Sequence, residues 1–241
     1  MPSPCRAVLF DLDGVLTPTV EAHKRAWAQL FSAVLPPTVA QYTSDDYMRL
    51  VDGRPRYDGV RAVLASRGLQ LPDGAPGDPP EADTVCGLGN RKDAVFRAEL
   101  ARGLAPYPGS LLFVDALHLP MAVVSGSRNA RAVLAAAGLE HMFDVVVDGL
   151  VAEQLGLAGK PAPDTFSEAA RRLGVTNSQA VVIEDALNGV QAGQAGGFGL
   201  VVGVDRGAGR DALLANGADI VVDDLAQLLT QQQFLDLVQI Q

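Results

Sequence analysis

Two carboxylates, Asp11 and Asp13, stand one residue apart directly after the apolar run at residues 7–10. Such a run has no solvated face, which is typical of a buried strand in a parallel sheet. Strand side chains alternate, so both carboxylates would point the same way and repel each other. A divalent cation or a substrate proton would relieve that repulsion, which predicts a metal and catalytic site. The alternative is a strand end with an Asp-Gly turn and solvated carboxylates.

Three later motifs carry polar groups that could join this pair. Ser125-Gly126-Ser127 follows the apolar run at 121–124 and offers a hydroxyl and backbone amides to phosphate oxygens. Lys160, one of three lysines beside sixteen arginines, lies between glycine and proline. Glu184 and Asp185 end the run at 180–183. Taken singly, these residues could be a helix cap, a solvated lysine and a strand-end turn. Because all three motifs occur in this order after the carboxylate pair, the sequence favours a single site that contains them.

The elements that would position these groups alternate between strands and helices. Apolar runs predict strands at residues 7–10, 121–124, 145–147, 180–183, 200–202 and 220–222. The helical patterns between them stop at glycines placed as left-handed caps, at positions 138, 174 and 217. This alternation predicts an α/β fold with a doubly wound, Rossmann-like parallel sheet, whose ligand crevice lies at the carboxyl ends of the strands.

Residues 19–104 break the alternation. They contain no buried strand run, but they show helical patterns at residues 21–34, 45–51, 57–67 and 91–102, and a Pro- and Gly-rich loop at 71–80. We therefore expect an α/β core domain at residues 1–18 and 105–241, interrupted by an all-helical cap domain at residues 19–104. Because the insertion begins soon after Asp13, the cap is expected to lie over the carboxylate pair.

Composition limits the partners. The 241 residues carry a net charge of −9, which argues against nucleic-acid or membrane partners and leaves room for a local basic pocket around a small anion. Cys5 and Cys86 show neither CxxC nor zinc-type spacing and are expected to be reduced. No signal peptide or membrane span is recognisable, so we expect a cytoplasmic protein. We also expect it to be a monomer.

Together, the segment DLDGVLT, Ser125, Lys160-Pro161 and Glu184-Asp185 resemble the motifs of the haloacid dehalogenase-like superfamily, and specifically its β-phosphoglucomutase-like capped phosphotransferases. The resemblance implies that Asp11 is a nucleophile that forms an aspartyl-phosphate and that Asp13 is the general acid and base. It implies that Ser125 and Lys160 hold the phosphoryl group. It also implies Mg²⁺, bound by Asp11, the backbone carbonyl of Asp13 and Asp185, with Glu184 acting directly or through water.

The same resemblance extends to residues that would bind a small phosphorylated sugar. These are His23, Trp27, Gly53, Arg56 and Lys92 in the cap, and Ser127, Arg128 and Asn129 in the core. His23 and Trp27 could instead be cap packing, since they lie four residues apart on one helical face. Arg56 could be a solvated arginine, with Arg54 in its place. Pro18 and the long loop at 72–81 depart from the family pattern.

Three functions fit these motifs. The first is a hexose phosphate mutase that converts β-glucose 1-phosphate to glucose 6-phosphate through the aspartyl-phosphate. The second is a sugar-phosphate phosphatase that passes the same phosphoryl group to water. The third is a receiver-type phospho-acceptor, which needs neither the cap nor an acid two residues after the acceptor. The motifs favour the mutase, with the phosphatase as the alternative.

Overall fold

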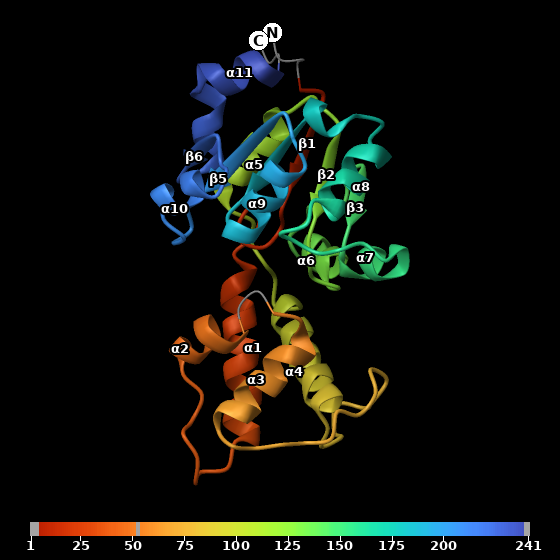
Figure 1. Ribbon diagram of the computed structural model, residues 1–241, viewed down its shortest axis with the longest axis vertical. Helices are drawn as coiled ribbons and strands as arrows, with labels where there is room; N and C mark the ends of the chain where they lie inside the picture. The colour runs from red at the N-terminus through yellow and green to blue at the C-terminus, as the bar shows by residue number, and fades with distance from the viewer. Residues whose placement is uncertain (1–4, 52–53, 239–241) are drawn as a thin grey trace. The chain divides into compact units, whose positions relative to one another are not determined.

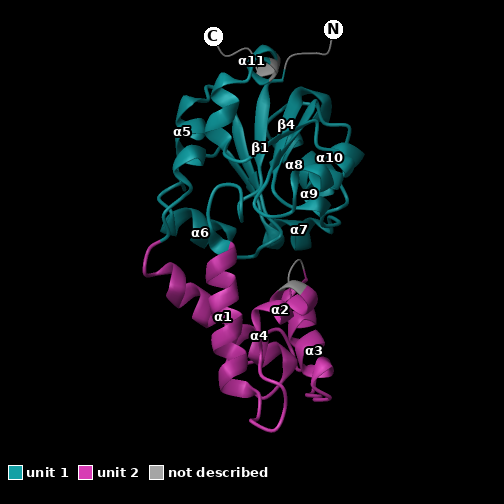
Figure 2. Cartoon of the chain, turned by 90° about the vertical axis from the view of Figure 1, so that its left-hand side faces the viewer, with its two compact units in different colours: residues 1–19, 104–241 teal, residues 20–103 magenta. Residues whose placement is uncertain are grey.

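The computed structural model describes residues 5–51 and 54–238. The chain forms two compact units, drawn in different colours in Figure 2. Unit 1 comprises residues 1–19 and 104–241, and unit 2 comprises residues 20–103. No helix of the described residues is both long and apolar enough to cross a membrane.

Unit 1 is built on a six-stranded parallel sheet (Figure 1) with strand order β3-β2-β1-β4-β5-β6. Its strands are β1 (Ala7–Phe10), β2 (Met121–Val124), β3 (Val145–Val147), β4 (Ala180–Glu184), β5 (Leu200–Val204) and β6 (Ile220–Val222). The chain reverses its direction of winding at β1, which pairs with β2 on one side and β4 on the other. The predicted doubly wound sheet is confirmed, and β4 and β5 extend one and two residues further than predicted.

Helices cover both faces of this sheet. They are α5 (Pro108–Ala116), α6 (Ala130–Ala136), α7 (Gly149–Leu155), α8 (Asp164–Arg172), α9 (Leu187–Ala195), α10 (Arg210–Ala215) and α11 (Gln232–Val238), with short 3-10 turns η2 (Asn177–Gln179) and η3 (Leu225–Thr230). Leu9 belongs to the core cluster that contains Phe166 of α8, whereas the ring of Phe10 meets that of Phe113 of α5. Adjacent residues of β1 thus contact different helices, as expected for a strand buried on both faces.

Unit 2 is helical. It contains α1 (Thr19–Val34, from Val20 onward), α2 (Ser44–Asp46), the π-helical turn η1 (Tyr47–Val51), α3 (Arg56–Ser66) and α4 (Val85–Leu100). Helix α4 begins six residues before the predicted start at 91, because the Thr84 hydroxyl caps it by accepting from Gly87 N at 2.9 Å. Gly87 and Gly89 weaken the helical pattern in the sequence. A Cβ at Gly89 would lie 2.6 Å from the Tyr57 ring, so close packing against α3 explains that glycine.

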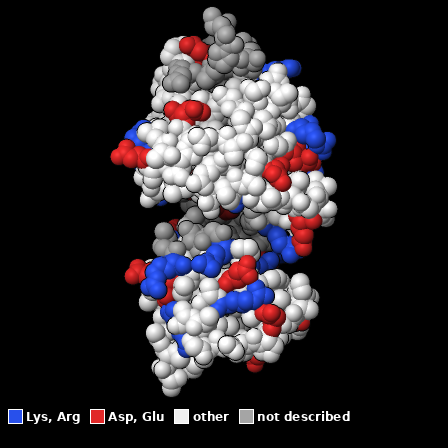
Figure 3. Space-filling model, in the orientation of Figure 1, with Lys and Arg blue, Asp and Glu red and all other residues white. Residues whose placement is uncertain are grey.

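The net charge resides in one unit. Unit 1 carries 8 basic and 17 acidic residues, a net of −9, whereas unit 2 carries 11 of each. Figure 3 shows basic side chains interspersed with acidic ones on unit 2. Cys5 and Cys86 are both buried and free.

Candidate active site

The two sequence-predicted carboxylates lie where β1 ends. Asp11 is buried, and its backbone N–H donates to Ile183 O of β4 at 2.9 Å. Asp13 is partly buried, and its carboxylate accepts hydrogen bonds from the Thr19 hydroxyl and, at 3.4 Å, from Ser125 Oγ. These bonds hold the Asp13 side chain in one orientation, beside the end of β2.

Gly14 gives the chain its turn after Asp13. Its φ of +90° is a conformation that side chains disfavour, and a Cβ there would lie 1.9 Å from Asp185 Oδ2. The glycine therefore both permits the turn and lets the Asp185 carboxylate come close to the β1 loop.

Lys160 is the cation of the site. Its Nζ lies 2.5 Å from Asp11 Oδ1, 2.7 Å from Glu184 Oε1 and 3.2 Å from the Val124 carbonyl. Burial alone would lower the pKa of Lys160, but the carboxylates of Asp11 and Glu184 raise it above its ordinary value. These contacts favour the charged form of Lys160, which lies against the carboxylate predicted to be the nucleophile.

An acidic cluster completes the site. Asp11, Glu184 and Asp185 each offer a carboxylate oxygen within 4.8 Å of the others. Glu184 is 2% exposed, and its Oε2 accepts from Ala186 N at 2.7 Å. A Cβ at Gly189 would lie 1.8 Å from Glu184 Oε1, so α9 makes room for this carboxylate with a glycine. The cluster is an all-oxygen donor set of the kind that hard divalent cations prefer.

The electrostatics of the cluster favour a bound cation. Burial raises the pKa of Asp11 to about 8, with Lys160 opposing the shift and Glu184 and Asp13 adding to it. Burial, Glu184 and Asp11 likewise raise the pKa of Asp185 well above its ordinary value. The three clustered carboxylates, of which Asp11 and Glu184 are buried, outnumber the single ammonium, and a divalent cation would supply the missing charge.

The loop after β2 carries the predicted phosphate-binding serine. Ser125 is buried, and its backbone N–H donates to Val147 O of β3 at 3.0 Å. Its hydroxyl accepts from Ser127 N at 3.1 Å, and the Ser127 hydroxyl accepts from Asn129 N at the same distance. Arg128 pairs with Glu153 of α7 at 3.3 Å and is half-exposed. The loop thus brings Ser125 beside Asp13 and leaves Arg128 at the surface.

In unit 2, the buried Lys92 pairs with the half-buried His23. Lys92 Nζ lies 2.6 Å from His23 Nδ1, and the His23 ring stacks on Phe96 with centroids 4.0 Å apart. Burial lowers the pKa of His23 well below its ordinary value, and Lys92 and Arg56 add to the shift. Neutral His23 then accepts from the ammonium at Nδ1, which leaves its proton on Nε2. Trp27 is 4% exposed and lies in the unit 2 core, as expected if its role is packing.

Arg56 is the first residue of α3. Its Nη1 pairs with Asp93 of α4 at 3.1 Å, and its guanidinium lies over the Tyr57 ring at 5.6 Å. The Arg56 side chain is 22% exposed, so part of it is accessible to a ligand. Gly53, the other residue predicted from this segment, lies outside the described residues.

Among the contacts to the Asp13 loop that were not predicted from the sequence, two involve Asp13 itself or the next residue. Thr19 donates to Asp13, and Arg206 Nε donates to the Gly14 carbonyl at 3.0 Å. Thr19 opens the first helix after Asp13, a position where hydroxyl side chains commonly bond to neighbouring groups, so its role could have been suspected. For Arg206 the only signal is its place just after a strand, where this sheet collects its ligand-binding groups.

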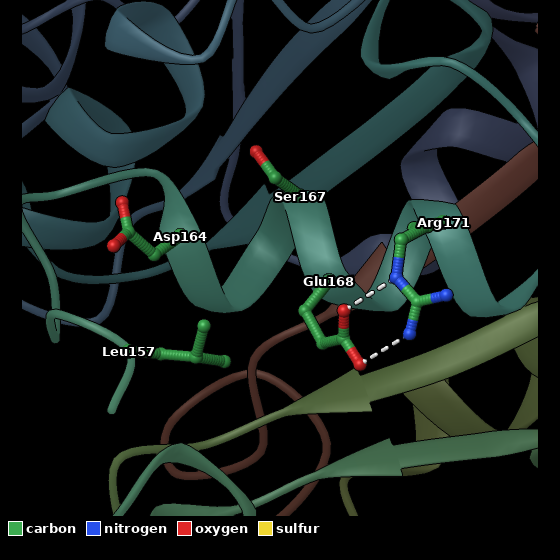
Figure 4. Close-up of a pocket in the computed structure, with 5 residues that line it drawn as sticks. All are labelled: Leu157, Asp164, Ser167, Glu168 and Arg171. Atoms are coloured by element: carbon green, nitrogen blue, oxygen red, sulfur yellow. Dashed lines mark hydrogen bonds and ion pairs between the residues drawn. The ribbon is translucent and has the colours of Figure 1, made fainter. Parts of the chain in front are cut away.

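A pocket of about 320 Å³ lies elsewhere in unit 1, against α8 (Figure 4). Arg171 forms two hydrogen bonds to Glu168 there, at 2.7 and 2.8 Å. None of the predicted site residues lines this pocket, and its charged residues Glu168 and Arg171 pair with each other. The sequence-predicted residues of unit 1 therefore lie away from this pocket.

Comparison with known proteins identifies a family model and several similar proteins. A family model described as haloacid dehalogenase-like hydrolase matches residues 5–197. The chain is 47% identical to a β-phosphoglucomutase of Mycobacterium bovis, covering 95% of this chain and 93% of that protein. It is 34% identical to the fructose-1-phosphate phosphatase YqaB of Escherichia coli, over 80% and 94% of the two chains. The crystal structure of a CbbY mutant from Rhodobacter sphaeroides in complex with xylulose-(1,5)bisphosphate has a TM-score of 0.73 at 26% identity, over 93% and 96%.

Proposed function

The chain belongs to the haloacid dehalogenase-like hydrolases, and on that premise we propose that it is a Mg²⁺-dependent hexose phosphate mutase. Its reaction would convert β-glucose 1-phosphate to glucose 6-phosphate through an aspartyl-phosphate at Asp11. The observation that carries the proposal is the contact of Lys160 with Asp11 within a cluster of oxygen ligands. The mutase sequence at 47% identity supports isomerase activity over the phosphatase alternative.

In the first half-reaction, the phosphorylated enzyme transfers its phosphoryl group to the 6-hydroxyl of the sugar phosphate. The Asp13 carboxylate takes the proton of that hydroxyl as its oxygen attacks phosphorus, and the bond from phosphorus to Asp11 breaks. The product is a 1,6-bisphosphate. In the second half-reaction, Asp11 attacks the phosphorus at C1, the bond from phosphorus to the C1 oxygen breaks, and Asp13 returns its proton to that oxygen.

The other residues act by holding charge and position. Lys160 would neutralise part of the charge that gathers on Asp11 and the phosphoryl oxygens, and the Ser125 hydroxyl would donate to one of those oxygens. The Asp11 and Asp185 carboxylates, with the Asp13 carbonyl, would hold Mg²⁺, and Glu184 would bind it directly or through water. The cation would supply charge compensation for phosphoryl transfer.

A mutase differs from a phosphatase because it must retain the bisphosphate while the sugar reverses its orientation in the site. That retention requires a cation for the phosphate that is not reacting. We assign this role to Arg56 of unit 2, with Lys92, His23, Trp27 and Gly53 supporting the sugar site. Ser127, Arg128 and Asn129 would contribute from the loop after β2. The partly exposed guanidinium of Arg56 supports this assignment, since among residues 5–51 and 54–238 Asp93 is its one carboxylate partner, at 3.1 Å.

The direct test is incubation with Mg²⁺, β-glucose 1-phosphate and a trace of the 1,6-bisphosphate, with glucose 6-phosphate and free phosphate measured together. A mutase forms glucose 6-phosphate with little free phosphate. If free phosphate appears as fast as the sugar phosphate disappears, the mutase proposal fails and the phosphatase replaces it.

Arg56→Ala tests how the second phosphate is held. Loss of a charge-assisted contact worth roughly 1.5 to 3 kcal/mol should reduce mutase turnover by about ten- to a hundredfold. Phosphorylation of Asp11 by acetyl phosphate should persist, because that compound has no second phosphate. Arg97→Ala is the matched control, since Arg97 also pairs with Asp93, at 3.0 Å, but its side chain is 64% exposed. Equal losses of both activities in Arg56→Ala would assign Arg56 to the fold instead.

A further inference from the structure

The loop that carries Asp13 is held through three consecutive backbone carbonyls. Each accepts a hydrogen bond from a different group of unit 1: Gly14 O from Arg206 Nε at 3.0 Å, Val15 O from Ser110 Oγ at 2.7 Å, and Leu16 O from Tyr107 N at 3.0 Å. Two of these donors lie at the start of α5, and the third follows β5. The loop is therefore fastened to two separate parts of the core.

Arg206 is the charged member of this set, and its guanidinium is held on three sides. Besides the bond to Gly14, its Nη1 donates to Asp223 O at 3.0 Å, after β6. The guanidinium also lies over the Tyr107 ring, 3.9 Å from the centroid. A planar cation fixed by two hydrogen bonds and a ring face has little freedom, so it fixes in turn the carbonyl that it binds.

This placement has an energetic cost. Arg206 Nη2 is buried and has no hydrogen-bond partner among the described residues. An unsatisfied buried donor is unfavourable, and a less constrained side chain would avoid it. Such a cost is commonly found where geometry serves function rather than stability.

Gly14 explains why a backbone contact is needed. It follows Asp13 directly, has a φ of +90° and has no side chain by which neighbouring groups could hold it. On the C-terminal side of Asp13 the Gly14 backbone is therefore held by two hydrogen bonds: its N–H donates to Thr17 O within the loop at 2.8 Å, and its carbonyl accepts from Arg206 outside the loop. Movement of this peptide would tilt the Asp13 backbone and carry its carboxylate away from the Ser125 hydroxyl, 3.4 Å away.

We infer that Arg206 is a positioning residue that holds the Asp13 loop in the orientation required for proton transfer. The inference rests on the proposed function in assigning that proton transfer to Asp13. The hydrogen bonds of the Arg206 side chain go to Gly14 and Asp223 carbonyls, so it acts on the site through Gly14. A displaced acid should slow reactions whose leaving oxygen needs a proton and spare those whose leaving group departs as a stable anion.

The test compares Arg206→Ala and Arg206→Lys with Arg210→Ala. Arg210 lies four residues further on and donates to Val221 O at 2.8 Å, outside the loop, so it controls for the lost charge. Sugar-phosphate turnover should fall by about ten- to a hundredfold in Arg206→Ala, the scale of a small misplacement of a catalytic group. The rate at which acetyl phosphate phosphorylates Asp11 should stay at the wild-type value. Lysine should restore turnover only in part, because it offers a point charge without the planar stack on Tyr107.

A second measurement does not depend on the substrate. Amide hydrogen exchange in residues 12–17 should accelerate in Arg206→Ala and remain unchanged in Arg210→Ala. Unchanged exchange, equal losses with both phosphoryl donors, or an equal effect of Arg210→Ala would each overturn the inference. If the wild-type enzyme hydrolyses sugar phosphates without isomerising them, only the mutase proposal fails. The rate of sugar-phosphate hydrolysis, whose leaving oxygen also needs a proton, would then replace mutase turnover in this test.

Discussion

Replacing Asp185 with asparagine should stabilise the metal-free protein while destroying its response to Mg²⁺. The substitution removes one of three carboxylates whose oxygens lie within 4.8 Å of one another, and it preserves the shape of the side chain. At an effective dielectric constant near 20, two unit charges at that separation repel by roughly 3 kcal/mol. Lys160 already offsets part of this repulsion through Asp11 and Glu184. The expected gain is therefore about 1 to 3 kcal/mol.

The sign of the pH dependence follows from the direction of the shifts. The pKa of Asp11 is raised to about 8, and that of Asp185 is also raised, relative to ordinary carboxyls. The unfolded chain ionises first, so these groups lower stability increasingly as pH rises from about 4 to 8. The advantage of Asp185→Asn should accordingly be largest near pH 8 and disappear toward pH 4.

Unfolding in urea at pH 5 and pH 8, with EDTA or with Mg²⁺, measures both effects. A saturating ligand at a hundred times its Kd stabilises by about 2.7 kcal/mol, and wild type should show a gain of this order at pH 8. Asp185→Asn should show little gain. Asp223→Asn is the control, since its carboxylate is 70% exposed after β6. A metal-free variant less stable than wild type at pH 8, or one that keeps the full Mg²⁺ response, would refute the reasoning.

Three further substitutions probe single groups. Asp13→Asn should slow sugar-phosphate turnover by about two to four orders of magnitude. It should leave the stabilisation by Mg²⁺ in place, because only the backbone carbonyl of Asp13 is proposed as a ligand, and loss of the Mg²⁺ response would contradict this. Lys160→Met should lower kcat by about a hundred- to a thousandfold, as measured with saturating sugar phosphate, and a normal kcat would remove Lys160 from the mechanism. Asp46→Asn should destabilise by about 2 kcal/mol at pH 7, because hydrogen bonds from Arg67 lower the pKa of Asp46 to about 2. That deficit should shrink in urea titrations as pH falls from 4 toward 2, and a constant deficit would exclude the ion pair as its cause.

The sequence by itself determined the sheet and the edge at which the candidate site lies. Continuous apolar runs such as residues 7–10 can be buried only as strands covered on both faces, and polar residues that end such runs must gather at the carboxyl edge. Asp11, Ser125 and Glu184 were predictable for this reason, and so was their proximity. Lys160 could be singled out by its rarity and its position between glycine and proline.

Only the tertiary structure decided which groups hold these residues and at what distance. Local patterns do not encode long-range partners, so no periodicity could reveal that Arg206 would bind the carbonyl of Gly14, 192 residues away. The start of α4 was missed for a related reason. Glycine weakens a helix in isolation, whereas here Gly89 allows α4 to approach Tyr57, and that packing outweighs propensity. The charges of the site likewise depend on burial, which arises only when the strands and helices have closed around it.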